Sequence, residues 1–157
     1  MSDAILYVNR TADLLAYQAD NVAGEQLTVQ SLHGDGAHSG RITTGIQKLA
    51  QRFILELLTE AGSMKYNPTR GCDFMTTLRV GGVQSQLDLF VAFSSALVDV
   101  RKNLQAEESE TDPDDEKYDS AEIINVTFSP GEAAVYVKIN SVAGDSRTVI
   151  APINTVI

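Results

Sequence analysis

Residues 42–61 read ITTGIQKLAQRFILELLTEA and carry the strongest periodic signal in the chain. Their apolar side chains recur at the i, i+3, i+4, i+7 spacing that places them on one face of an α-helix. These apolar positions are Ile42, Ile46, Leu49, Ala50, Phe53, Ile54, Leu57, Leu58 and Ala61. The solvent face is expected to carry Gln47, Lys48, Gln51, Arg52, Glu56 and Thr59. Thr44 with Gln47 fits a capping box, and Gly62 fits the residue just past the end, so the stretch predicts an amphipathic helix.

A second helix is predicted from about Gln84 to Leu104, with Ser85 and Asp88 as its capping pair. One apolar stripe comprises Leu87, Phe90, Val91, Ser94, Leu97 and Val98, and it is widened by Leu89, Phe93, Ala96 and Val100. Because so much of its circumference is apolar, we expect this helix to be covered on more than one side. The core is expected where the two helices meet a sheet, around Phe53, Leu57, Phe90 and Leu97.

After residue 120 the hydrophobic period changes from helical to two. Residues 121–128 (AEIINVTF) and 132–141 alternate apolar and polar side chains, which indicates half-buried strands. The intervening Ser-Pro-Gly-Glu, residues 129–132, supplies hairpin turn chemistry. A second turn at Gly144-Asp145 leads into a third strand, residues 147–151, which Pro152 is expected to stop. The predicted class is α+β, with two main amphipathic helices packed on a small antiparallel sheet that ends in a C-terminal three-stranded meander.

The chain is expected to form a single domain over residues 1–157. Within it we distinguish an N-terminal arm (1–40), a helical part (42–105), an acidic loop (107–119) and the C-terminal strands (121–157). In the arm, residues 5–8 and 26–32 could be strands, with a short helical turn between them. The acidic loop holds eight acidic residues against Lys117 alone, so we expect it to be solvated and dispensable for folding.

Composition narrows the classes of function. The formal net charge of −9 disfavours nucleic acid as a partner, because neutralising phosphates requires a basic surface. No apolar run has the roughly 18 residues needed to cross a bilayer, so no membrane partner is expected and the chain is predicted to be soluble and made in the cytosol. The single cysteine, Cys72, cannot form an internal disulfide and is interpreted as a turn or core thiol.

Candidate chemical sites are weak. Glu56 and Glu60 lie four residues apart on the first helix, as a pair of hydrolytic carboxylates could, but nothing else in the sequence supports hydrolysis, and a solvated helix face is the preferred interpretation of both residues. The glycine-rich residues 33–40 (HGDGAHSG) lack phosphate-loop spacing, and His33 and His38 make a poor metal constellation. The acidic loop does not match a calcium-binding loop. We therefore expect no catalytic residue, metal or cofactor, and a binding or structural protein rather than an enzyme.

The ordered set of segments resembles the baseplate wedge and sheath-initiator family of contractile phage tails, the phage tail lysozyme-like wedge proteins, which have relatives in type VI secretion baseplates. The resemblance covers roughly residues 42–151: an amphipathic helix ending in Leu-Leu-Thr, a glycine turn, an extended stretch with Pro and Gly, a second helix and a strand pair. The matching motif residues are Leu57, Leu58, Thr59, Gly62, Pro68 and Gly71. Two departures are Ser63-Met64 in place of Glu-Arg after the turn glycine, and the absence of the Glu-Pro-Arg motif before the first C-terminal strand.

The resemblance implies a non-catalytic structural subunit of the virion, located in the tail baseplate and assembled in the host cytoplasm. Its partners would be the tail sheath protein, baseplate wedge subunits and the tail tube or tube-initiator protein, and it would template sheath polymerisation by strand addition. An exposed apolar strand edge is suited to that mode of binding. The expected contact residues are Val135, Val137, Ile139, Arg147, Thr148, Val149 and Ile150. Three alternatives stay open: an edge covered by the chain's own N-terminal arm, a standalone adaptor of the same fold, and a tail-associated cell-wall hydrolase.

Overall fold

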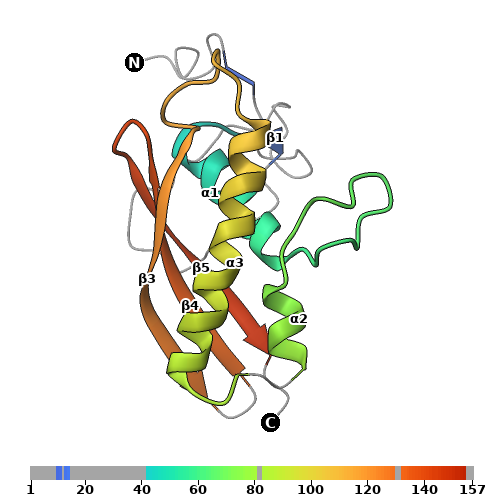
Figure 1. Ribbon diagram of the computed structural model, residues 1–157. Helices are drawn as coiled ribbons and strands as arrows, with labels where there is room; N and C mark the ends of the chain where they lie inside the picture. The colour runs from blue at the N-terminus through green and yellow to red at the C-terminus, as the bar shows by residue number, and fades with distance from the viewer. Residues whose placement is uncertain (1–9, 12, 15–41, 81–82, 130–131, 155–157) are drawn as a thin grey trace, which may run out of the picture.

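The computed structural model describes residues 10–11, 13–14, 42–80, 83–129 and 132–154. Helices pack on a three-stranded antiparallel sheet, so the predicted α+β class is confirmed (Figure 1). The elements are β1 (Asp13–Leu14), β2 (Ile42–Thr43), α1 (Gly45–Leu58), α2 (Phe74–Arg79), α3 (Gln86–Glu107), β3 (Tyr118–Ser129), β4 (Glu132–Ser141) and β5 (Ser146–Asn154). The predictions for residues 5–8, 26–32 and 33–40, with His33 and His38, lie outside the described residues.

The first predicted helix is present as α1, but it starts three residues later than its apolar pattern. Ile42 and Thr43 form β2, which pairs antiparallel with β1. Asp13 and Leu14 therefore form a strand, β1, in the region where a short helical turn was considered. Thr44 occupies the N-cap position, but its side chain makes no capping hydrogen bond, so the predicted capping box is wrong. The helix ends at Leu58, and Gly62 adopts a φ of +77° in the turn beyond it.

The meander β3-β4-β5 presents one face to the helices. Val126, Val135 and Ala151 are aligned across the three strands, and all three are buried. The same alignment holds for Ile123, Val137 and Val149, as the predicted period of two requires. The hairpin turn at residues 129–132 is confirmed by the pairing of Ser129 with Glu132.

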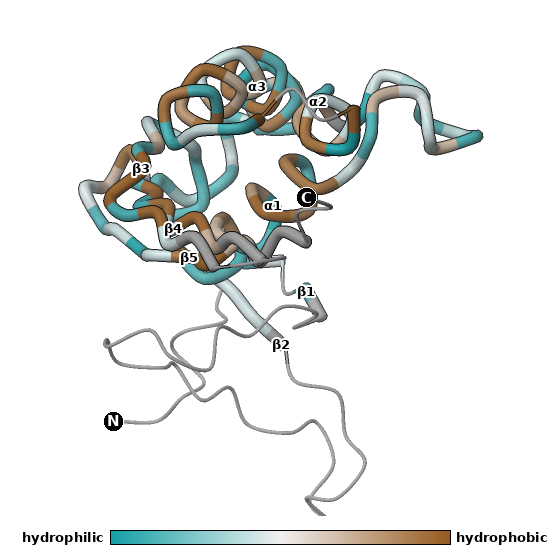
Figure 2. The backbone as a smooth tube through the Cα atoms, turned by 90° about the horizontal axis from the view of Figure 1, so that it is seen from below, coloured by the Kyte–Doolittle hydropathy of each residue, from teal (hydrophilic) through white to brown (hydrophobic). Residues whose placement is uncertain are grey.

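Helix α1 is the centre of the molecule. It contacts β4 and β5 on one side and α2 and α3 on the other, and Figure 2 shows it between the α2–α3 layer and the sheet. Phe53 and Leu57 are fully buried, as predicted, and Phe53 stacks on Tyr118 with ring centroids 6.1 Å apart. Being enclosed, α1 also buries two residues assigned to its solvent face, Gln51 and Glu56.

Helix α3 uses a different face from the one predicted. Its buried residues are Leu89, Ala92, Phe93, Ala96, Val100 and Leu104. Phe90 is 40% exposed, Leu97 is only partly buried, and Leu87, Val91 and Val98 are exposed, so the predicted stripe is largely outward and α3 is not covered all round. The buried face includes two alanines, Ala92 and Ala96, whose small side chains permit close packing against neighbouring elements. The Ser85–Asp88 capping pair is confirmed: Ser85 Oγ accepts from Asp88 N, and Asp88 Oδ2 accepts from Gln84 N.

Candidate partner-binding surfaces

The central position of β4 rules out part of the predicted edge. Val135, Val137 and Ile139 are fully buried, and β4 pairs with β3 on one side and β5 on the other. Both sets of backbone groups are therefore used inside the sheet, and these three side chains belong to the core. Assigning them to a partner-binding edge was wrong, because the alternating pattern identifies a buried face but not the order of strands in a sheet.

Strand β5 forms one end of this sheet. It pairs with β4 over nine consecutive residue pairs without a register shift. Thr148 is half-buried and Val149 faces the core, while Arg147 and Ile150 are half-buried and already have interactions within the chain. The strand continues through Pro152 to Asn154, so the predicted stop at Pro152 is wrong. Proline is tolerated here because a residue on an outer strand can direct its missing N–H away from the ladder.

Strand β3, at the other end of the sheet, is irregular. Its register with β4 shifts between Tyr118 and Ser120 and again between Ile123 and Asn125. Asn125 Oδ1 also accepts a hydrogen bond from Val126 N at 2.9 Å. Bulges and side-chain caps of this kind obstruct the pairing of a further strand, so the two ends of the sheet differ in character.

The acidic segment is not simply a solvated loop, because one of its carboxylates is buried in the fold; its dispensability for folding stays a prediction, and its contacts argue against it. Glu116 is only 2% exposed; its Oε1 accepts from Gly45 N at 2.9 Å and its Oε2 pairs with Lys48 Nζ at 2.6 Å. The carboxylate therefore caps α1 from 71 residues away and faces the positive end of the helix dipole. Arg10 adds an ion pair to Asp115 at 2.6 Å.

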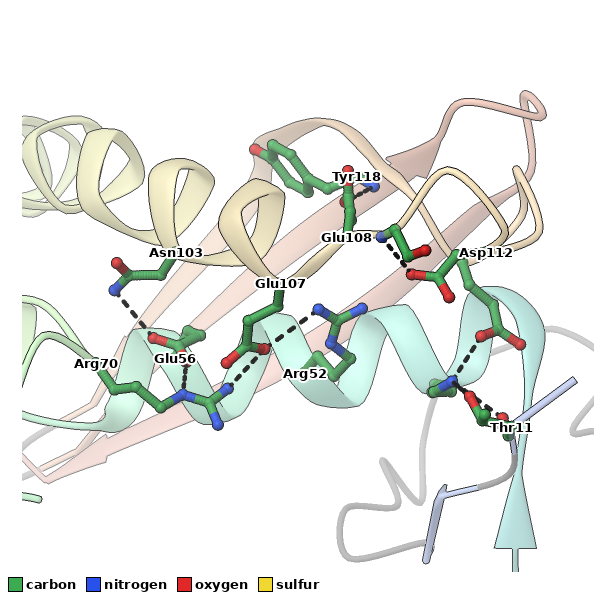
Figure 3. Close-up of polar contacts among 12 residues, drawn as sticks. Thr11, Arg52, Glu56, Arg70, Asn103, Glu107, Glu108, Asp112 and Tyr118 are labelled. Carbon is green, nitrogen blue, oxygen red and sulfur yellow. Dashed lines mark hydrogen bonds and ion pairs between the residues drawn. The ribbon is translucent and has the colours of Figure 1, made fainter. Parts of the chain in front are cut away.

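Further residues of the acidic segment are also hydrogen-bonded. Glu108 Oε1 accepts from Tyr118 N at 2.6 Å, and Asp112 Oδ2 accepts from Ser109 N at 2.8 Å (Figure 3). The backbone oxygens of Asp114 and Lys117 accept from the turn between β4 and β5. These acids therefore serve as acceptors for specific backbone donors, which is why the segment can be ordered without apolar side chains.

A second buried carboxylate, Glu56, organises the connection between α1 and α2. Its Oε1 accepts from Arg70 Nε, and its Oε2 accepts from Gly71 N at 2.9 Å and from Asn103 Nδ2 at 3.2 Å. Asn103 also donates to Gly71 O at 3.1 Å. Glu107, at the end of α3, accepts from both Arg70 and Arg52 (Figure 3). We call Glu56, Arg70, Gly71 and Asn103 the clamp.

Gly71 is required for the clamp. Its φ is +85°, and a Cβ atom at this position would lie 2.4 Å from Thr59 O. The close approach arises because Cys72 N donates to Thr59 O and Ala61 N donates to Cys72 O, which closes the base of the intervening loop. Only glycine satisfies both the backbone conformation and the space.

The remaining motif residues surround this arrangement. Leu57 is buried, Leu58 packs against the core, and Thr59 Oγ1 donates to Leu55 O at 2.6 Å. Pro68 lies in the exposed loop between Gly62 and Gly71. The motif residues thus form the end of α1, the loop that follows it and the point where that loop closes. Sequence reasoning placed Glu56 on a solvent face, counted Glu116 only as one acid of a solvated loop, and did not single out Arg70 or Asn103. The one available signal was that Glu56 is flanked by core positions of α1.

Cys72 is a core thiol. It is fully buried, its Sγ lies 3.4 Å from Leu57 O, and burial raises the pKa of the thiol to about 11. Glu56 and Glu60 do not form a carboxylate pair open to substrate, since Glu56 is buried in the clamp and Glu60 pairs with Arg79 at 2.8 Å. No group of three or more metal-ligating side chains occurs among the described residues.

The described part of the chain contains no helix with the length and apolar character needed to cross a bilayer. Its fold defines the class of a small α+β protein with a three-stranded meander. Comparison with protein-family models gave no match, and searches of curated proteins and of solved structures gave none either.

Proposed function

We propose that this chain is a structural subunit of a contractile phage tail baseplate, which links the wedge and tube core to the first sheath ring. In this proposal a strand of a neighbouring sheath chain joins the sheet next to β5 and so starts sheath polymerisation. The observation that carries it is the difference between the two ends of the sheet: β5 is regular over nine pairs, whereas β3 has two register shifts. Its second support is the sequence resemblance over residues 42–151.

The direction of the backbone groups of β5 follows from the register. Val126 N binds the side chain of Asn125 and so points away from β4, which makes Val126 and Val135 a non-hydrogen-bonded pair. Val135 then directs its N–H and C=O to Ala151 on β5. The direction of the backbone groups alternates along β5. The backbone groups of Val149 are therefore directed to β4, and those of Ile150 and Pro152 are directed away from it. The proline at 152 agrees, because an outward position needs no N–H for the ladder.

An incoming strand would bond to the outward groups at Ile150. Ile150 already interacts within the chain, so the new strand exchanges with that contact instead of filling an empty position. Binding through backbone groups gives affinity, and the alternating side chains of β5 set the register.

A pair of proline variants tests the proposal. Ile150→Pro removes an outward N–H but no ladder hydrogen bond to β4. Because Ile150 already interacts within the chain, the melting temperature should fall slightly, and less than for Val149→Pro, yet the variant should fail to nucleate purified sheath protein of the same tail on reconstituted baseplates. Val149→Pro removes a ladder hydrogen bond to β4, so its melting temperature should fall. The length distribution of sheaths, observed by electron microscopy, gives the nucleation rate. If folded Ile150→Pro starts sheaths at the wild-type rate, strand addition at β5 is refuted.

A further inference from the structure

The loop between α1 and α2 projects from the body of the molecule, at the right of Figure 1. Every residue from 61 to 69 is exposed, and Tyr66 is 93% exposed, the largest exposed fraction of any described large apolar or aromatic side chain. Met64 is also exposed, at 44%. A fully solvated loop gains no stability from burial, so its shape must come from other interactions.

Hydrogen bonds fix the shape of the α1–α2 loop, both at its base and along its projecting part. The clamp and the hydrogen bonds of Cys72 close the base, and three turn bonds support the projecting part: Ser63 N to Glu60 O, Asn67 N to Met64 O and Arg70 N to Asn67 O, at 3.1–3.2 Å. At the tip, Lys65 Nζ lies 5.5 Å from the centroid of the Tyr66 ring. A buried carboxylate is thus used to hold a loop that itself contributes nothing to the core. Burying a charge is costly unless it is paired, which suggests that the position of the loop matters.

The loop also differs in charge from the rest of the chain. Residues 61–72 (AGSMKYNPTRGC) contain Lys65 and Arg70 and no acidic residue, in a protein with a net charge of −9. Arg70 is neutralised by Glu56 and Glu107, so Lys65 is the charge presented with the Tyr66 ring. An exposed tyrosine on a rigid support is a typical anchor of protein interfaces, since the ring buries a large area with little loss of conformational freedom.

We propose that this loop is the contact by which the chain anchors in the baseplate: Tyr66 and Met64 enter an apolar pocket on a wedge subunit, and acidic side chains at the rim of that pocket pair with Lys65. The inference rests on the proposed function and names one partner of the same subunit. The wedge contact and the sheath contact then lie on different elements, the α1–α2 loop and β5.

The test is co-expression of the full chain with the wedge subunits of the same tail, followed by affinity purification and measurement of the bound ratio. Tyr66→Ala should lower wedge binding at least about tenfold, as loss of an aromatic anchor does, with an unchanged melting temperature. Tyr66→Phe keeps the ring and should bind normally, and Lys65→Glu should weaken binding. Val142→Ala, a truncation at an exposed apolar residue of the β4–β5 turn, is the matched control and should have no effect.

A photo-crosslinking amino acid at position 66 provides a second readout, and it should form a covalent adduct with a wedge subunit. Wedge binding by Tyr66→Ala at the wild-type level overturns the loop contact and leaves the sheath-initiator role standing. Absence of wedge binding by the wild-type chain overturns both. A crosslink to sheath or tube protein alone assigns the loop to another partner and overturns the inference.

Discussion

Gly71 illustrates how one residue can hold a projecting loop in place. Its positive φ and its contact with Thr59 O leave no room for a side chain, and its N–H donates to Glu56. Gly71→Ala should therefore destabilise the fold by about 3 kcal/mol or more, through backbone strain and the displacement of Thr59. Gly62→Ala is the control, because Gly62 also has positive φ but nothing within 4 Å of a Cβ atom, and it should cost only about 1 kcal/mol. Urea unfolding measures both, and equal losses would contradict the close packing at Gly71.

Cys72 makes stability depend on pH on the alkaline side. Burial raises the pKa of its thiol from 9.0 to about 11 in the folded protein, so the unfolded chain loses this proton first. The stabilisation is fully present below pH 9 and is lost as the pH rises toward 11. Between these values, the free energy of unfolding of the wild type relative to Cys72→Ala should fall by about 1.4 kcal/mol per pH unit. A constant difference between pH 8 and pH 11 in urea titrations would show that the thiol is not desolvated.

The pKa of Tyr118 is also raised, chiefly by burial, so its ionisation above pH 10 lowers stability with the same sign. This contribution is common to the wild type and Cys72→Ala. It cancels in their difference, which is why the comparison reports on the thiol.

At the scale of elements, the orientation of α3 is the sharpest departure from its apolar pattern. Phe93 is buried against Phe74, with ring centroids 6.1 Å apart, whereas Phe90 is 40% exposed. Phe93→Ala should cost about 3–5 kcal/mol, as for other buried phenylalanines, and Phe90→Ala should cost about 1 kcal/mol or less. Thermal melts of the two variants check the register of the helix. A larger loss of stability for Phe90→Ala than for Phe93→Ala would mean that α3 buries the apolar stripe predicted from the sequence, and would contradict the observed register.

The acidic segment is likewise an element with a defined task, because Glu116 caps α1 and pairs with Lys48. Glu116→Ala leaves Gly45 N–H and the ammonium group without their buried acceptor, so it should cost about 3 kcal/mol. Glu110→Ala, at an exposed acid of the same segment, should change stability by less than about 0.5 kcal/mol. Replacing the whole segment by a Gly-Ser linker should lower the melting temperature markedly. An unchanged temperature would mean that the carboxylates do not stabilise the fold.

At the scale of the whole molecule, most local features were predictable, the capping box at Thr44 being an exception, and long-range ones were not. The two helices, the meander and the Ser85 cap depend on neighbouring residues, so their spacing identifies them. Glu56 and Glu116 hydrogen-bond to Gly71 and Gly45, at sequence separations of 15 and 71 residues, and no local pattern indicates such partners. The central position of β4 was missed for the same reason, since alternation identifies the buried face of a strand but not its neighbours.

The same distinction separates the two proposed contacts. The strand edge was predicted from sequence, and strand order then moved it from β4 and β5 to β5 alone. The projecting loop was read only as a turn, because its rigidity depends on a carboxylate from α1 and an amide from α3. Both proposed contacts, the edge of β5 and the α1–α2 loop, lie outside the exposed faces of the helices.

A cryo-electron microscopy map of the junction between baseplate and first sheath ring tests the central claim most directly. The account predicts a fourth strand beside Ser146–Asn154, belonging to a sheath subunit and hydrogen-bonded to the outward groups of Ile150. A fourth strand formed by residues 1–41 of the same chain, or sheath density that contacts only β3 or the helices, would contradict it.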